Sequence, residues 1–483
     1  MLLSALLKGV GEISPSQDVE IENVTDKLSE VKNNSLFVCI DGDSFDGNDF
    51  VTEALLKGAA AVISEKQTKA DISIKVPSSR KALALIASNF YGNPAKKLKI
   101  IGVTGTNGKT TTAFLVRHIL EYSGKKCGLT GTVKKITGGK SVSSTLTTPE
   151  SAELQKTFAE MLKNGCEYCV SEISSQALSQ SRAEGVSFCA AAITNITPEH
   201  LNYHHNMENY ISAKLLLFKS SDFSVINVDD KNIRENKSRI SCRQFTVSLK
   251  DRIADYFAQN IVSTAHGVEF ELLKDRIYKV CTPLPGIYNV YNALCAVAVC
   301  SELGIDTQIC VDALRSFSGV EGRCEKVPTG CDFNVIIDYA HTPDGFQNII
   351  SSARAFTENR IITVFGCGGD RDKSKRAVMG KIASELSDAV IVTDDNPRTE
   401  SPVRIICDIL EGMSGTKCHY AVVSDRKDAI GLALKIAEKG DTVLILGKGH
   451  EKYQITANGK IPFDEKEIIQ EFLKQDEKIW NSY

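Results

Sequence analysis

Short apolar runs alternate with amphipathic, helix-forming stretches along most of this chain. The alternation is most regular after residue 322, where each apolar run is nearly continuous and is followed by a segment of helical periodicity. Strands of this kind are typical of a parallel sheet with helices on both faces, because both surfaces of such a sheet are buried. The strands expected there are 334–339, 361–365, 389–393, 420–423 and 442–446.

Two less regular units precede that sheet. The first ends at a turn-forming cluster, 91–95, and contains strand candidates at 35–40, 59–63 and 72–76. The second ends with a helix at about 289–303, and its strand candidates are 98–103, 168–173, 189–196 and 224–228. A chain of 483 residues is too long for one ordinary core. We therefore predict an α/β protein with three domains, at 1–95, 96–321 and 322–483.

The composition is that of a globular protein, with 42% hydrophobic and 24% charged residues and a net charge of -3. It gives no support to nucleic-acid binding, and no apolar run approaches the roughly 20 residues of a membrane span. Met1 to Val10, which Lys8 interrupts, is expected to form an amphipathic helix rather than a signal peptide. The 15 cysteines indicate reduced thiols and a cytoplasmic protein, and packing explains the lone pair Cys166 and Cys169. We expect a monomer that binds small molecules.

A glycine-rich loop lies between the predicted strand 98–103 and a helical stretch in which Leu115, Val116, Ile119 and Leu120 share one face. Strand, glycine loop, Lys-Thr and helix form a triphosphate site, because backbone N–H groups and the helix N-terminus face the phosphates. Lys109 is expected to reach the phosphate oxygens and Thr110 to bind Mg²⁺. The nucleotide-binding residues expected here are Thr104, Gly105, Thr106, Asn107, Gly108, Lys109 and Thr110.

Four polar runs follow predicted strands of the third unit, at the carboxyl ends where ligands of parallel sheets bind. They are residues 338–341, 366–372, 394–398 and 447–451. One such run carries little weight, but four at the same edge of one sheet indicate a second binding site. We therefore expect a ligand there that is distinct from the one at the phosphate loop.

The loop Gly-Thr-Asn-Gly-Lys at 105–109 and the four polar runs, in this order, resemble the Mur ligases over nearly the whole chain. The resemblance implies a three-domain fold with a UDP-substrate domain, a central ATPase of the phosphate-loop type and a Rossmann-like C-terminal domain. It also implies ATP-dependent addition of meso-diaminopimelate to UDP-N-acetylmuramoyl-L-alanyl-D-glutamate in peptidoglycan precursor synthesis. In that chemistry the substrate carboxylate becomes an acyl phosphate, which the amino group of the incoming amino acid then attacks. Such a reaction needs cations and metal ligands more than a protein nucleophile.

The resemblance assigns residues to ATP and Mg²⁺. Glu172 and His200 match metal-site residues, and Lys214 matches a lysine that the family carries as a carbamate, with an ordinary lysine as the alternative. The chain reads Glu-His-Leu-Asn at 199–202, where the family usually has Asp-His-Leu-Asp. A zinc site from His200, His204 and His205 is the competing interpretation. The further nucleotide contacts that it implies are Asn289, Arg323 and Asp338; a structural salt bridge is the alternative for Arg323.

For the UDP-linked substrate, the matching positions carry hydroxyl, amide and guanidinium groups, which suit uridine, pyrophosphate and carboxylate. They are Phe45, Thr147, Thr148, Ser174, Gln180 and Arg182. The chain departs from the family before its first Leu-Phe-Val strand. Where relatives carry Asp-Ser-Arg, it has Lys27, Leu28 and Ser29, so the usual serine contact is not expected.

For the incoming amino acid, the run 395–398 resembles the signature of diaminopimelate-adding members. Arg398 would pair with the distal carboxylate, a group that lysine lacks; capping of a helix is the alternative. Arg371 would bind a carboxylate, and Glu451 with the carbonyl of Gly447 would bind the distal ammonium. The implied pocket consists of Arg371, Asp395, Asn396, Pro397, Arg398, Gly447 and Glu451.

Other functions remain open at this point. The same reaction with L-lysine, or a ligase like folylpolyglutamate synthase, would use the same phosphate loop. The N-terminal 95 residues and the Asp-Asn-Pro-Arg run at 395–398 count against both. A nucleotide-dependent switch would carry an Asn-Lys-x-Asp motif, and the near match at 236–239 lacks the aspartate.

Overall fold

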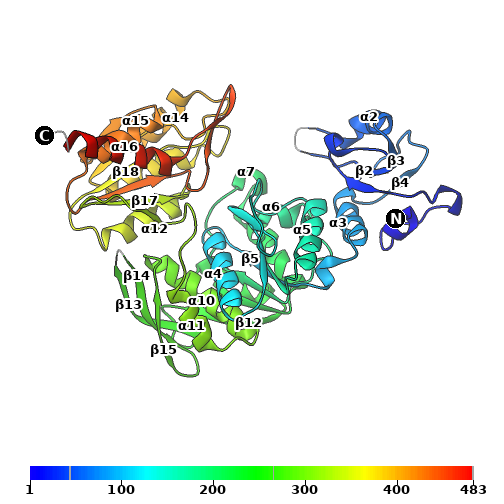
Figure 1. Cartoon of the computed structure of the whole chain (residues 1–483), viewed down its shortest axis with the longest axis horizontal. Helices are drawn as coiled ribbons and strands as arrows, with labels where there is room; N and C mark the ends of the chain where they lie inside the picture. The colour runs from blue at the N-terminus through cyan, green and yellow to red at the C-terminus, as the bar shows by residue number, and fades with distance from the viewer. Residues whose placement is uncertain (43–44, 265, 481–483) are drawn as a thin grey trace.

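The computed structural model describes residues 1–42, 45–264 and 266–480, with side chains up to residue 474. In the described residues, three large sheets follow one another along the chain, each with its own helices, and a fourth, two-stranded sheet lies in the C-terminal unit (Figure 1). The N-terminal unit lies at one end, the central unit in the middle and the C-terminal unit at the other end (Figure 1). The fold is therefore α/β throughout, as the alternation of apolar runs and helical stretches predicts.

The N-terminal sheet is parallel, in the order β1-β2-β3-β4. Its strands are Asn23–Thr25, Ser35–Val38, Ala59–Ser64 and Ser73–Lys75. Its helices are α1 (Leu3–Leu6), α2 (Val51–Leu56) and α3 (Ser79–Phe90). The strand β1 has no counterpart among the predicted strands. The helix at the N-terminus is much shorter than the stretch Met1 to Val10, because a turn follows Leu6.

The central sheet has eleven strands in the order β15-β14-β13-β12-β11-β10-β5-β9-β6-β7-β8. Seven neighbouring strands are parallel, namely β5 (Lys99–Thr104), β6 (Cys127–Thr130), β9 (Tyr168–Glu172), β10 (Ala190–Ile193), β11 (Phe223–Asn227), β12 (Arg243–Ser248) and β13 (Tyr256–Thr264). Antiparallel hairpins extend both edges, through β7 (Lys134–Ile136), β8 (Ser141–Ser143), β14 (Gly267–Leu273) and β15 (Ile277–Thr282).

The helices of the central unit include α4 (Lys109–Tyr122) and α10 (Ile287–Glu302), which pack against each other. The others are α5 (Ser151–Lys163), α6 (Ser175–Ser179), α7 (Leu201–His204), α8 (Met207–Leu215), α9 (Lys231–Asn236) and α11 (Thr307–Arg315). Leu115, Val116, Ile119 and Leu120 of α4 are fully buried, as their helical spacing predicts. The helix α3 of the N-terminal unit packs on α5 and so connects the two units.

The C-terminal sheet has the order β16-β17-β21-β18-β19-β20. Its strands are Glu325–Val327, Asn334–Asp338, Ile361–Phe365, Ala389–Val392, His419–Val422 and Thr442–Leu446. All pair in parallel except the edge strand β16. Its helices are α12 (Pro343–Arg354), α13 (Lys375–Leu386), α14 (Pro402–Glu411), α15 (Arg426–Ile436) and α16 (Glu465–Trp480), and a hairpin joins β22 (Tyr453–Thr456) to β23 (Gly459–Pro462).

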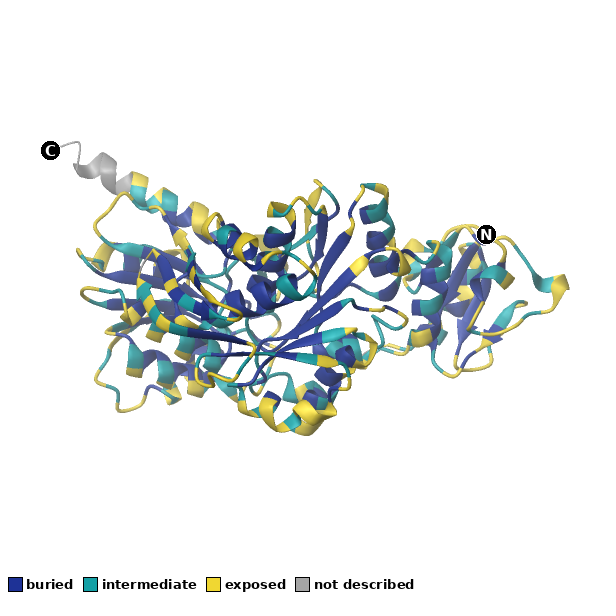
Figure 2. Ribbon diagram, turned by 90° about the horizontal axis from the view of Figure 1, so that it is seen from below, coloured by how far each residue is buried: buried dark blue, intermediate teal, exposed yellow. Residues whose placement is uncertain are grey.

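Burial follows the sheets: their inner strands are buried, whereas helices and hairpins carry the exposed positions (Figure 2). Cys166 and Cys169 are buried free thiols in the core of the central unit. Within the described residues, every helix falls short of the length and hydropathy that a membrane crossing needs.

Candidate functional site

The phosphate loop connects β5 to α4, as the sequence predicts. Gly105 and Gly108 adopt positive φ angles of 144° and 84°, a conformation that favours glycine. A Cβ atom on Gly108 would lie 2.4 Å from the Oδ1 atom of Asn292, so α10 closes the loop from behind. Helix α4 has fourteen residues and no side-chain cap at Gly108. Its first N–H groups are therefore available to an anion.

Two lysines converge on this loop, the half-buried Lys109 and the buried Lys214. The Nζ atom of Lys109 donates to the carbonyls of Gly105 and Thr106 at 2.9 and 2.7 Å. The Nζ atom of Lys214, from α8, donates to the same Gly105 carbonyl at 2.8 Å. Burial lowers the pKa of both amines, and the neighbouring charge of Lys109 lowers that of Lys214 further. Because the two ammonium groups face each other, the site favours an anion between them or a modified Lys214.

Glu172 ends β9 and is fully buried next to the loop. Its carboxylate accepts hydrogen bonds from the hydroxyls of Thr110 and Thr132, both at 2.9 Å. Arg323 approaches from the start of the C-terminal unit and donates to Thr110 Oγ1 at 3.3 Å. Its Nε atom is buried without a hydrogen-bond partner, and within the described residues Arg323 forms no ion pair with a carboxylate. A structural salt bridge therefore does not account for Arg323.

Glu199 is a functional candidate that the sequence did not reveal. Its carboxylate lies 3.8 Å from the Nε2 atom of His200 and 3.3 Å from the Nε2 atom of His341, which belongs to the C-terminal unit. Burial alone would raise the pKa of Glu199, but the bond from His341 and the nearby cations lower it overall. Glu199 therefore supplies a carboxylate beside the phosphate loop. The glutamate at position 199, where the family usually has aspartate, was a signal in the sequence. The partner of Glu199, His341, lies 142 residues further along the chain, so the local pattern does not reveal the pair.

The histidines do not form a metal cluster. His204 is buried and its Nε2 atom bonds the hydroxyl of Ser175 at 2.9 Å. Within the part of the chain that the structure describes, no three His, Cys, Asp or Glu side chains are arranged as metal ligands. The zinc interpretation therefore lacks a ligand set. The oxygen donors of Glu172, Thr110 and Thr132 suit Mg²⁺, which is bound through few carboxylates together with waters and phosphates.

Asn289 and Asp338 flank the boundary between the central and C-terminal units. The amide of Asn289, in the first turn of α10, donates to the carbonyl of Pro285 at 2.7 Å and accepts from Asn292 at 2.9 Å. Asp338 ends β17 and accepts from the N–H groups of Cys324 and Ala340, both at 2.6 Å. Burial raises the pKa of Asp338. Its position next to Arg323 links it to the phosphate site.

The residues predicted for the UDP-linked substrate form one cluster in the central unit. The Thr148 hydroxyl donates to the carbonyl of Glu172 at 2.8 Å and accepts from the N–H group of Ser174 at 3.0 Å. Arg182 donates to the carbonyl of Thr148 at 3.0 Å and to Gln180 Oε1 at 2.6 Å. Thr147 precedes Thr148 in the chain, and its hydroxyl lies 3.1 Å from that of Thr132. The cluster is thus continuous with the surroundings of Glu172.

The N-terminal unit faces this cluster with charged groups. Arg182 pairs with Glu150 at 2.9 Å, and burial raises the pKa of Glu150 although Arg182 opposes the shift. Asp26 and Arg80 of the N-terminal unit also influence the Glu150 carboxyl, so both lie near it. Neither was singled out from the sequence, because only the packing of α3 on α5 brings them to the central unit.

Phe45 lies elsewhere in the N-terminal unit. It is 53% exposed and meets Phe50 edge-to-face, with 6.3 Å between the ring centres. Leu28, one of the three residues that replace the family's Asp-Ser-Arg, packs on the apolar cluster around Phe37. Ser29 is exposed. Packing therefore explains Leu28, and the structure assigns no contact to Ser29.

The second site lies at the carboxyl end of the C-terminal sheet, as predicted. Arg371 and Arg398 lie together there, since a Cβ atom on Gly368 would be 3.0 Å from Arg398 Nη1 and 3.8 Å from Arg371 Cγ. Burial and the charge of Arg398 lower the pKa of Arg371. Arg398 Nη1 donates to the carbonyls of Gly369 and Asn396, at 2.8 and 3.3 Å. These acceptors precede α14, so Arg398 does not cap a helix C-terminus, and its Nε and Nη2 donors suit a carboxylate.

A carboxylate, that of Glu451, lies at the same rim as the two arginines, since Asn396 contacts both Glu451 and Arg398. Glu451 Oε2 accepts from Asn396 Nδ2 at 2.8 Å and lies 3.4 Å from the ammonium of Lys448. Asp395 is buried and accepts from the N–H group of Asn396 at 2.6 Å. Gly447 adopts a φ of 114°, and a Cβ atom there would lie 2.8 Å from Asp395 Oδ2. Pro397 continues the turn between Asn396 and Arg398. The predicted pocket residues are thus brought together.

Comparisons with known proteins agree with this arrangement. Residues 20–91 match the catalytic domain of the Mur ligase family, 103–300 match the Mur ligase middle domain, and 322–449 match the glutamate ligase domain of Mur ligases. A protein of Clostridium acetobutylicum, named UDP-N-acetylmuramoyl-L-alanyl-D-glutamate–2,6-diaminopimelate ligase 1, is 45% identical over 464 residues, which cover 95% of this chain and 96% of the relative. The chain belongs to the Mur ligase family.

Other relatives of this Mur ligase cover the whole chain. A protein of Clostridioides difficile named as a ligase for the same two substrates is 43% identical, with 98% of this chain and 100% of the relative covered. A solved structure of such a ligase matches with a TM-score of 0.69 and 30% identity, over 99% of this chain and 100% of the other. A MurF ligase of Thermotoga maritima in complex with ADP matches with a TM-score of 0.64 at 20% identity, over 96% and 100%. At this level of identity, the likeness to the MurF ligase shows a shared fold alone.

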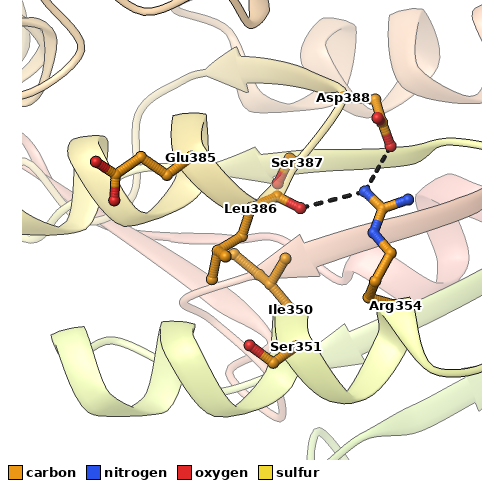
Figure 3. Close-up of a pocket in the computed structure, with 7 residues that line it drawn as sticks. All are labelled: Ile350, Ser351, Arg354, Glu385, Leu386, Ser387 and Asp388. Atoms are coloured by element: carbon orange, nitrogen blue, oxygen red, sulfur yellow. Dashed lines mark hydrogen bonds and ion pairs between the residues drawn. The ribbon is translucent and has the colours of Figure 1, made fainter.

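A separate pocket of this Mur ligase lies between α12 and α13, with a volume of about 320 Å³. Figure 3 shows Arg354 donating to the carboxylate of Asp388 and to the carbonyl of Leu386. Because the guanidinium is already paired with these local acceptors, the pocket presents no free charge to a ligand. We therefore place the functional site at the phosphate loop and the C-terminal rim.

Proposed function

We propose that this Mur ligase uses ATP to join meso-diaminopimelate to UDP-N-acetylmuramoyl-L-alanyl-D-glutamate. One observation carries the proposal: two adjacent arginines, Arg371 and Arg398, lie at the same rim of the C-terminal sheet as the carboxylate of Glu451. This pattern suits an amino acid with a carboxylate and an ammonium group at each end. Relatives named for this reaction, at 43–45% identity, support it.

We assign the phosphate loop to ATP. Lys109 would give up the carbonyls of Gly105 and Thr106 for phosphate oxygens, and the first N–H groups of α4 would bind the same group. Arg323, whose Nε atom lacks a partner, would neutralise charge that develops during phosphoryl transfer. The further nucleotide contacts in this proposal are Thr104, Thr106, Asn107, Asn289 and Asp338.

We assign Mg²⁺ to the oxygen donors beside the loop. Glu172 and Thr110 would hold it, with His200 and a carbamylated Lys214 nearby, and the ion would screen the negative charge of the phosphates. The lowered pKa of Lys214 supports the carbamate, because only a neutral amine reacts with carbon dioxide. This chain's own residues then position the substrate carboxylate and exclude water.

We assign the cluster Thr147, Thr148, Ser174, Gln180 and Arg182, with Phe45, to the UDP-linked substrate. Its hydrogen-bond connection to Glu172 supports a position for the end of that substrate near the phosphates of ATP. The domain boundaries of this proposal are 1–95, 96–321 and 322–483. The enzyme would act in the cytoplasm as a monomer on small molecules.

The test is phosphate release from Mg-ATP with UDP-N-acetylmuramoyl-L-alanyl-D-glutamate and either meso-diaminopimelate or L-lysine. Turnover with diaminopimelate and none with lysine is the expected result. Turnover with lysine alone would leave the ligase in place and refute the assignment of Arg398. Phosphate release without any amino acid would instead indicate a nucleotide switch.

A further inference from the structure

The two loops that form the amino-acid pocket follow strands that are not neighbours in the sheet. One loop, residues 394–398, follows β19, and the other, residues 447–451, follows β21. The strand β18 lies between β19 and β21 in the sheet order. The ladder hydrogen bonds therefore fix each loop relative to β18, and the side chains and backbone groups beyond the strand ends must set the spacing between the loops.

Lys448 is a cross-link between the two loops. Its side chain is fully buried, and its Nζ atom donates to the Oδ1 atom of Asn396 at 3.0 Å. The N–H group of Ile455 donates to the same oxygen at 2.9 Å. With both donors on Oδ1, the Nδ2 group of Asn396 must point to Glu451, to which it donates at 2.8 Å. The ammonium of Lys448, together with the Ile455 N–H group, thus turns the Nδ2 side of the Asn396 amide toward the Glu451 carboxylate, to which the ammonium also donates directly at 3.4 Å.

A second buried cation holds the backbones of the same loops. Arg426, at the start of α15, is 1% exposed. Its Nη1 and Nη2 atoms donate to the carbonyls of Asp394 and Leu446, at 3.3 and 2.8 Å. These residues directly precede Asp395 and Gly447. The buried carboxylate of Glu465 accepts a hydrogen bond from the Nε atom of Arg426 at 2.8 Å. Arg426 therefore holds the backbones of the two loops in place, and Lys448 connects side chains of the same loops.

Burial of an ammonium group is costly unless it is fully paired, and well-packed apolar residues often stabilise a fold as well or better. A lysine at position 448 is therefore poorly explained by stability alone. Both of its side-chain partners, Asn396 and Glu451, are pocket residues. We propose that Lys448 is a positioning residue for the amino-acid substrate: it orients the Asn396 amide and, through it, the Glu451 carboxylate that receives the substrate's distal ammonium. This rests on the proposed function only in taking these loops as the amino-acid site.

The test compares K448M, N396D and the double variant with the intact enzyme in the phosphate-release assay. K448M removes the charge and keeps the length of the side chain. We expect its KM for the amino acid to rise by about tenfold or more, with the KM for ATP and for the UDP-linked substrate within about twofold and kcat within about threefold. The control is K439M, because Lys439 is 81% exposed and precedes the start of β21, whereas the pocket loop follows the other end of that strand; its KM values should not change.

N396D keeps the test valid if K448M fails to fold. An aspartate at 396 still accepts from Lys448 and Ile455, but it places a carboxylate against Glu451, so the amino-acid KM should rise selectively there too. Where both variants fold, their effects on the amino-acid KM should not multiply in the double variant, because Lys448 and Asn396 contact each other and both contact Glu451. A folded K448M with an unchanged amino-acid KM, an equal rise in all three KM values, effects that multiply in the double variant, or an N396D enzyme with an unchanged amino-acid KM would overturn the proposal.

The outcome separates this proposal from the proposed function. The intact enzyme is assayed first with diaminopimelate and with lysine. If it turns over only lysine, the diaminopimelate assignment fails, and the role of Lys448 is then measured on the KM for lysine. Absence of turnover with either amino acid would refute the proposed function, and thermal-shift titrations of the intact protein and K448M with each amino acid would then test Lys448. A shift in the intact protein that weakens in K448M would support its role, and equal responses would overturn it.

Discussion

The amide of Asn107 in the phosphate loop donates to the carboxylate of Asp344 in α12, with 2.7 Å between Nδ2 and Oδ2. Asn107 belongs to the central unit and Asp344 to the C-terminal unit, so a hydrogen bond ties the loop directly to the other unit. Asp344 also accepts from Asn348 at 3.2 Å. Burial raises the pKa of the Asp344 carboxyl, although the bond from Asn107 opposes this shift. The conformation of the phosphate loop therefore depends on how the C-terminal unit is docked.

Replacement of Asp344 by alanine should weaken ATP binding. A hydrogen bond to a charged group contributes about 1.5–3 kcal/mol, so we expect the KM for ATP to rise by about tenfold with a smaller change in the KM for the amino acid. Asp344→Asn, which keeps an acceptor, should recover part of the loss. The control is Asp332→Ala, since the Asp332 side chain is 76% exposed. A folded Asp344→Ala enzyme with an unchanged ATP KM would contradict this role.

Lys214 should carry a carbamate in the active enzyme. Burial and the charge of Lys109 lower the pKa of the Lys214 amine, so the neutral amine that reacts with carbon dioxide is present at a lower pH than for an ordinary lysine. We expect a carbamate signal in the ¹³C NMR spectrum of protein incubated with labelled bicarbonate, and none in Lys214→Met. Activity should fall when carbon dioxide is removed and return when bicarbonate is added. The exposed Lys219 provides the control, as Lys219→Met should keep the signal.

The buried His204 should make the protein sensitive to acid. Burial, with the nearby charges of His200 and Lys214, lowers the pKa of His204 from 6.5 to about 4. Between these values the unfolded chain binds a proton that the folded chain does not, so stability is lost as the pH falls through this window. From linkage, the loss at about pH 5 is about 2 kcal/mol. In His204→Gln, urea denaturation at about pH 7.5 and about pH 5 should show a smaller loss than in the intact protein.

The exposed His266 provides the matched control for His204. His266→Gln should lose as much stability on acidification as the intact protein, because the His266 side chain is exposed to solvent and lies outside the core. If His204→Gln were as acid-sensitive as the intact protein, the titration of other groups would account for the effect.

The hydrophobic pattern predicts the elements around the phosphate loop well and the sheet edges poorly. The strand before Gly105 and the helix after Gly108 are recognisable because a buried strand and a one-sided helix have different periods. The hairpin strands β14 and β15, by contrast, alternate buried and exposed residues, as in Ile277–Thr282. An alternating run carries no signal for which strand it joins. The sequence therefore predicts a parallel sheet but not its antiparallel extension.

The residues of the candidate site also differ in how well the sequence predicts them. Lys109, Glu172 and Arg398 stand in local motifs; the structure places Lys109 and Glu172 beside the phosphate loop and Arg398 at the C-terminal rim, and their ligands stay predictions. Glu199 and Lys448 were missed because their importance lies in partners far along the chain, His341 and Asn396. Leu28 shows the reverse case, since the departure from the family at that position is explained by packing. The contact of Glu199 is set by the docking of two units and that of Lys448 by the packing of two loops within one unit, and a local pattern contains neither.

Arg398 should determine the choice between diaminopimelate and lysine. Its backbone has a φ of 54°, a conformation that asparagine tolerates best among the residues with a side chain, so Arg398→Asn removes the guanidinium with little strain. Loss of a charge-assisted contact to the distal carboxylate should raise the KM for diaminopimelate by about tenfold to a hundredfold. Lysine has no such carboxylate, so its own turnover should not fall, and the preference between the two substrates should narrow by the same factor. Arg404→Asn, at an exposed position of α14, should leave the preference unchanged. If Arg398→Asn weakened the use of both amino acids equally, Arg398 would be holding the loop through Gly369 and Asn396 rather than reading the substrate.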